Sequence, residues 1–121
     1  MFASRASAAR DFERSQISAV GTCKTARGQE FEIEYRDISQ GGCRVDDLVG
    51  GMSLGAHVSL YIEGTGPIRA EVAWRQGDRV GLEFLQLLPD RVYRHLIRQE
   101  WDLARRAPLL DGRVYPVRRI I

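Results

Sequence analysis

A two-residue alternation of apolar and polar side chains constrains this chain more than any other feature of its sequence. The segment QEFEIEYRD places Phe31, Ile33 and Tyr35 at every second position, with glutamate or arginine between them. Successive side chains of a β-strand point to opposite faces of a sheet. The segment therefore predicts a strand with one buried face and one wet face.

The same alternation recurs in AHVSLYIEG, IRAEVAWRQ and RVGLEF, and QISAVGTCK and GCRVDD are further candidate strands. Glycine-rich breakers (ARGQ, VGGMSLG, EGTGP and RQGDR) separate these runs. Six short strands about ten residues apart predict an antiparallel barrel or sandwich. The residues expected on the inner faces of AHVSLYIEG, IRAEVAWRQ and RVGLEF are Val58, Leu60, Ile62, Ile68, Ala70, Val72, Trp74, Val80, Leu82 and Phe84.

The period changes in the segment PDRVYRHLIRQEWDLARR, which begins at Pro89. Proline suits the first turn of a helix, and Val92, Leu96 and Leu103 fall at spacings close to helical turns. We expect one amphipathic helix packed on the strands and ended by Pro108. The predicted organisation is a flexible arm over residues 1–15, a barrel with its helix over 16–107 and a tail over 108–121.

Composition limits the class of protein. With 121 residues, 44% of them hydrophobic, the chain suits one domain with a real core. The formal net charge of +2 does not indicate a nucleic-acid or membrane partner. The sequence shows neither a secretory signal nor a membrane-spanning run, so we expect a cytoplasmic protein without membrane insertion.

The cysteines and histidines do not suggest a metal site. Cys23, Cys43, His57 and His95 lack the close spacing of zinc motifs, so we expect no metal and two free thiols. Both histidines are expected at the surface, and Trp74 is expected in the core, although an aromatic ring at a barrel rim can stack on a base.

The segment DISQGG, at the end of a predicted strand, is a candidate for chemistry. Asp37 and Ser39 offer a carboxylate and a hydroxyl at a turn, and Gly41 and Gly42 allow a ligand to approach main-chain N–H groups. A second interpretation is structural: both polar side chains bond their own turn. The residues alone leave both readings open.

A pair of arginines, Arg10 and Arg14, lies four residues apart before the first strand. Guanidinium groups match phosphate oxygens and the O6/N7 edge of guanine. Taken together, Arg10-Asp-Phe-Glu-Arg14 followed by Asp37-Ile-Ser39-Gln-Gly-Gly42 resembles the R-x-x-x-R and D-x-S-x-x-G motifs of the PilZ domain family. The segment EVAWRQGDRVGLEF resembles the closing strands of that family, so the resemblance covers residues ~10–85.

This resemblance implies an all-β fold with a C-terminal α-helix, built as a six-stranded antiparallel β-barrel. It also implies a bacterial receptor for the second messenger cyclic di-GMP that signals to an unidentified protein partner. By position, Arg10 and Arg14 would grip phosphates and guanine edges, Asp37 and Ser39 would contact a guanine, and Gly42 would allow close approach. No cofactor is implied beyond this ligand.

Other function classes fit less well. An adaptor that no longer binds nucleotide, and acts through protein contacts, is the main alternative. A barrel for single-stranded nucleic acid would need exposed aromatics interleaved with basic residues, and this chain has a single lysine, Lys24. We expect no enzyme, because no nucleophile elbow, P-loop or dinucleotide fingerprint occurs.

Overall fold

The computed structural model describes residues 13–109, so most of the expected arm and tail lies outside the described residues. The first strand begins at Ser15, which is the last residue of the expected arm. In chain order, the elements of the described part are β1 (Ser15–Thr25), β2 (Glu30–Ile38), β3 (Gly42–Asp46), β4 (His57–Ile62), β5 (Thr65–Gln76), β6 (Arg79–Phe84), α2 (Asp90–Ile97) and α3 (Trp101–Arg106).

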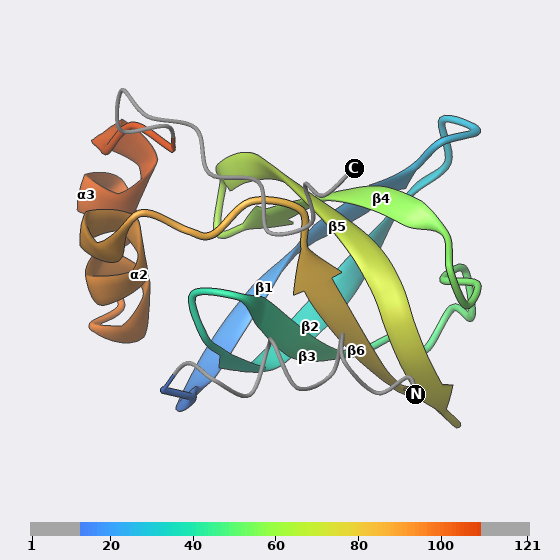
Figure 1. The fold of residues 1–121 in the computed structure, drawn as a ribbon. Coiled ribbons are helices and arrows are strands. Elements are labelled where there is room, and N and C mark those ends of the chain that lie inside the picture. The colour runs from blue at the N-terminus through green and yellow to red at the C-terminus, as the bar shows by residue number, and fades with distance from the viewer. Residues whose placement is uncertain (1–12, 110–121) are drawn as a thin grey trace.

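The strands close into a barrel in the order β1-β2-β3-β6-β5-β4, and every neighbouring pair is antiparallel. The two helices stand together at one side of the barrel, where α2 contacts β1 and α3 contacts β5 (Figure 1). The predicted fold, an all-β six-stranded barrel with helical structure at its C-terminal end, is confirmed.

The interior of the barrel follows the alternation of the sequence. Ile33 and Tyr35 of β2 are buried while the glutamates between and before them are exposed. Similar alternation fills the core from β4 and from most of β5. Burying these side chains is the main source of stability, because each large aliphatic or aromatic group contributes roughly 1.5–3 kcal/mol on leaving water.

Trp74 departs from the prediction. It is 38% exposed and lies on the outside of the barrel instead of in the core. The pairing of β5 with β6 shifts register between Val72 and Trp74, which is a β-bulge. A bulge inserts one extra residue and so reverses the face on which the following side chains emerge. The expectation of a core Trp74 was wrong for this reason.

The expected single helix is also wrong in one respect, because it is divided into α2 and α3. Gln99 has a φ of 60°, and its N–H donates to the carbonyl of Leu96 at 3.1 Å. The N–H of Glu100 donates to the carbonyl of His95 at 2.9 Å. These two bonds form a Schellman motif, which ends a helix with one residue in the left-handed conformation.

The connection between β3 and β4 is fixed by a buried ion pair. The Asp47 carboxylate accepts hydrogen bonds from Arg75 Nη1 at 2.9 Å and from the N–H groups of Gly50 and Met52 at 3.0 and 2.9 Å. Burial acts to raise the pKa of Asp47, but these hydrogen bonds outweigh it and hold that pKa below its ordinary value. The loop is therefore held in one conformation.

Both cysteines are buried in the barrel and neither forms a disulfide. Burial, with the nearby Asp47 carboxylate, raises the pKa of Cys23 to about 12. His57 is exposed, as expected, with its Nε2 3.6 Å from Oε1 of Glu71. Over residues 13–109 no cluster of three potential metal-ligating side chains occurs, and no helix there is long and apolar enough to cross a membrane.

Candidate functional site

Three of the charged side chains on the outer face of the barrel form a linked cluster. Nη1 of Arg14 donates to Oδ1 of Asp37 at 2.7 Å, and Nε of Arg44 lies 3.2 Å from Oδ2 of the same carboxylate. The Asp37 side chain is 16% exposed, whereas those of Arg14 and Arg44 are 39% and 35% exposed. One carboxylate thus lies between two guanidinium groups that solvent still reaches.

The outward position of Asp37 depends on a second bulge. Counting by two from Ile33 and Tyr35 would place Asp37 on the inner face of β2. The register between β2 and β3 shifts between Tyr35 and Asp37, so Arg36 and Asp37 both emerge outside and Ile38 turns into the core. Bulges often re-aim a side chain next to a functional site.

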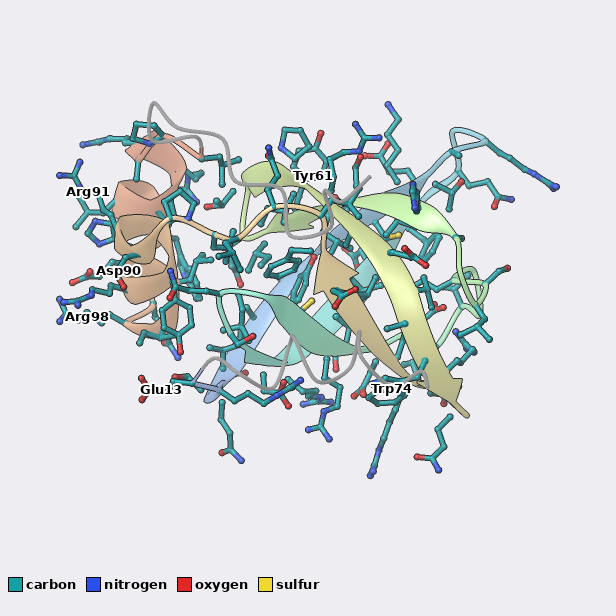
Figure 2. All side chains as sticks on the ribbon, in the orientation of Figure 1. Glu13, Tyr61, Trp74, Asp90, Arg91 and Arg98 are labelled. Atoms are coloured by element: carbon teal, nitrogen blue, oxygen red, sulfur yellow. The ribbon has the colours of Figure 1, made fainter. Side chains whose placement is uncertain are left out.

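The same outer face continues across the barrel to Trp74. Asp37 is paired with Arg44, Arg44 with Gly81, and Gly81 with Trp74, so these positions form one row over β2, β3, β6 and β5. A side chain at Gly81 would begin 2.1 Å from Nε1 of Trp74, which means that the indole lies directly over this glycine. Figure 2 shows Trp74 on the same lower side of the barrel as Glu13, the residue before Arg14.

Ser39 does not reach this surface. It is fully buried, and its hydroxyl accepts hydrogen bonds from the N–H groups of Gly41 and Gly42 at 3.2 and 3.1 Å. In this conformation the hydroxyl stabilises its own turn, which is the structural interpretation that the sequence left open. Asp37 behaves differently, since its carboxylate forms ion pairs with the side chains of Arg14 and Arg44.

Gly42 is needed for contact between strands. A Cβ atom at this position would lie 2.4 Å from the carbonyl oxygen of Leu82 on β6, far inside ordinary contact. Gly42 pairs with Glu83 in the register of β3 with β6. The close approach that requires a glycine here is therefore an approach of β6, which brings Arg44 and Gly81 into one row.

The five residues predicted for ligand binding have different positions in the structure. Arg14 and Asp37 come together at the surface, Ser39 and Gly42 shape the turn and the strand pairing beneath it, and Arg10 lies outside the described residues. Ligand binding by these five residues stays a prediction.

Sequence reasoning missed Arg44 and favoured a core position for Trp74 over a position at the rim. Arg44 could have been found, because it lies between two apolar residues of GCRVDD, and a tight turn after Asp37 brings it opposite the carboxylate. Trp74 could not have been found by periodicity, since no residue type in VAWR marks the bulge that turns the indole outward.

The described structure thus combines a closed β-barrel with a charged outer face, on which a carboxylate lies between two guanidiniums in the same row as an indole. The sequence model of the PilZ domain matches residues 8–99, about three quarters of the chain. The chain belongs to the PilZ domain family. Domains of this family are in general effector domains associated with cyclic di-GMP, and are not generally enzymes. Comparison with curated proteins gave no match.

Proposed function

We propose that this protein is a receptor for cyclic di-GMP, which binds on the outer face formed by Arg14, Asp37, Arg44 and Trp74, and that Arg10, which lies outside the described residues, is a further ligand contact. The observation that supports this proposal is the row of charged and aromatic side chains next to both family motifs. Ligand binding would change the surface that the protein presents to a partner.

Charge favours a ligand of this kind. Cyclic di-GMP carries two phosphates and a charge of −2, and Arg14 and Arg44 supply two guanidiniums at the solvent boundary. A surface ion pair such as Arg14–Asp37 is worth about 0.2–1 kcal/mol. Hydrogen bonds from a guanidinium to phosphate are worth roughly 1.5–3 kcal/mol. The two phosphates therefore offer Arg14 and Arg44 charge-assisted hydrogen bonds in place of those to Asp37.

The same exchange frees Asp37 for base recognition. A carboxylate can accept hydrogen bonds from the N1–H and N2–H groups of guanine, and adenine does not offer this pair of donors. A bidentate contact of this type discriminates between bases by about 1–3 kcal/mol. The indole of Trp74 offers a flat apolar surface in the same row for stacking on a base, which is typically worth about 1–3 kcal/mol.

In this proposal Ser39 and Gly42 contribute by shaping the site. The Ser39 hydroxyl fixes the turn after Asp37, and Gly42 lets β3 approach β6 so that Arg44 and Gly81 lie opposite each other. A direct contact between Ser39 and the ligand would require this turn to open.

Isothermal titration calorimetry tests the proposal. We expect heat with cyclic di-GMP and binding about five- to 150-fold weaker with cyclic di-AMP, because of the bidentate contact at Asp37. Asp37→Asn keeps the shape of the side chain but replaces one acceptor oxygen by a donor, and should reduce the preference for guanine. Equal affinity for the two dinucleotides would contradict the role given to Asp37.

A ligand-free adaptor is the second candidate. It is favoured by one observation: the Asp37 carboxylate already has two arginine partners, and the Ser39 hydroxyl is satisfied within its turn. Such a surface is stable without nucleotide. If titration with cyclic di-GMP gives no heat, this candidate replaces the receptor.

A further inference from the structure

The hydroxyl of Tyr93, on α2, binds both residues that flank Arg14. It donates to the carbonyl oxygen of Glu13 at 3.1 Å and lies 2.8 Å from Oγ of Ser15. A carbonyl only accepts, so the one proton of the tyrosine goes to Glu13, and Ser15 must donate to Tyr93. The residues before and after Arg14 are thus both hydrogen-bonded to α2.

The other half of the candidate site is also bonded to the start of α2. The N–H of Leu88 donates to the carbonyl oxygen of Gln40 at 2.9 Å, and Nε2 of Gln40 donates to the carbonyl oxygen of Leu88 at 2.9 Å. Gln40 belongs to the turn that follows Asp37, and Leu88 directly precedes Pro89, the N-cap residue of α2.

We propose that Tyr93 is a positioning residue for the ligand site and that α2 senses occupancy of that site. This inference rests on the proposed function for the identity of the ligand, but the coupling between Tyr93 and the Arg14 segment does not. The helix holds the arginine segment and the turn of Asp37 at the same time. A ligand that moves either segment therefore acts on the bonds that hold α2.

Tyr93 is well placed for this coupling because its ring and its hydroxyl have separate roles. The ring is buried in the core with Val92 and Leu96 of the same helix. The hydroxyl makes the hydrogen bonds to the residues on either side of Arg14. Tyr93→Phe therefore keeps the packing and removes both hydrogen bonds, whereas Ser15→Ala removes only one of them and Ser15→Thr retains a hydroxyl.

Hydrogen–deuterium exchange of the ligand-free protein tests the coupling without any ligand. We expect exchange in residues 13–17 to rise about tenfold in Tyr93→Phe, about threefold in Ser15→Ala, and little in Ser15→Thr. Tyr61→Phe is the matched control, since Tyr61 lies on β4 at the opposite side of the view from Glu13 (Figure 2). Equal exchange in Tyr93→Phe and the native protein would overturn the inference.

Titration with cyclic di-GMP tests the link to the ligand. We expect the affinity of Tyr93→Phe to fall about three- to tenfold relative to Tyr61→Phe, and ligand to change exchange in residues 90–97 of the native protein. If ligand binds the native protein but neither change occurs, the sensing role of α2 is wrong. If the native protein gives no heat, the proposed function fails while the exchange data on the ligand-free protein still decide the role of Tyr93.

Discussion

Gly42→Ala is expected to destabilise the barrel strongly, because the added methyl group would meet backbone. Its Cβ would lie 2.4 Å from the Leu82 carbonyl oxygen, about 1 Å short of ordinary contact, which begins at 3.4 Å. The carbonyl belongs to β6 and cannot rotate away, so β3 and β6 must separate. Overpacking of this kind costs about 1–3 kcal/mol, and one weakened ladder hydrogen bond adds about 1 kcal/mol.

The expected loss is therefore about 2–4 kcal/mol, which corresponds to a fall in Tm of roughly 10–25 °C for a domain of this size. Gly81→Ala is a matched comparison on the paired strand. Its Cβ would meet the indole of Trp74, a partly exposed side chain that can move away. We expect that variant to lose about 1 kcal/mol or less.

Urea unfolding of the two variants measures this difference. A Gly42→Ala protein within about 0.5 kcal/mol of the native protein would refute the strand-contact role, since ordinary surface substitutions fall in that range. Loss of cyclic di-GMP binding without loss of stability would instead assign Gly42 to the ligand, as the family resemblance implies.

Three further predictions concern other parts of the fold. Asp47→Asn should destabilise the protein by about 2–4 kcal/mol at pH 7 by breaking the buried pair with Arg75. Because the pKa of Asp47 is lowered on folding, the carboxylate contributes its full stabilisation above the pKa of the unfolded state, about 3.9, and loses it as the pH falls below that value. The urea unfolding curves of the native and Asp47→Asn proteins should therefore converge towards pH 2. Cys23 and Cys43 should resist iodoacetamide at pH 8 in the folded protein and react in urea, because burial raises the pKa of both thiols, and rapid alkylation of the native protein would contradict this. Gln99→Gly should raise the free energy of unfolding by about 0.5–1 kcal/mol, since glycine adopts the left-handed conformation without steric cost; an unchanged or lower urea midpoint would be the opposite result.

The sequence predicted the barrel well because alternation in most strands matches burial. The glutamates beside Ile33 and Tyr35 are exposed while those two side chains fill the core. The motifs R-x-x-x-R and D-x-S-x-x-G, and not the periodicity, located Arg14 and Asp37 as members of the candidate site.

The features that periodicity did not predict have a common cause. Asp37 and Trp74 both lie in phase with core residues of their strands, and each is turned outward by a bulge. A bulge depends on the pairing of two strands, so one strand read alone does not reveal it. The break in the helix was also hidden from the sequence, because the residue in the left-handed conformation there is Gln99 and not a glycine.

Ser39 shows the limit of a motif. The pattern D-x-S-x-x-G fixes which residue types occur, but the hydroxyl can turn to the backbone or to a ligand with the same sequence. Here the Ser39 hydroxyl accepts hydrogen bonds from the N–H groups of Gly41 and Gly42 in its own turn. The structure of the turn, and not its composition, decides this.

Calorimetric titration of cyclic di-GMP into Arg14→Ala tests the central claim most directly. Arg91→Ala is the control, because it removes the same charge from a residue of α2 that points away from the barrel (Figure 2). We predict that Arg14→Ala loses measurable binding and keeps a Tm within a few degrees of the native value, since the Arg14 ion pair is worth about 0.2–1 kcal/mol. The Arg91→Ala protein should bind as the native protein does. Unchanged affinity in Arg14→Ala would contradict the claim that this face of the barrel binds the ligand.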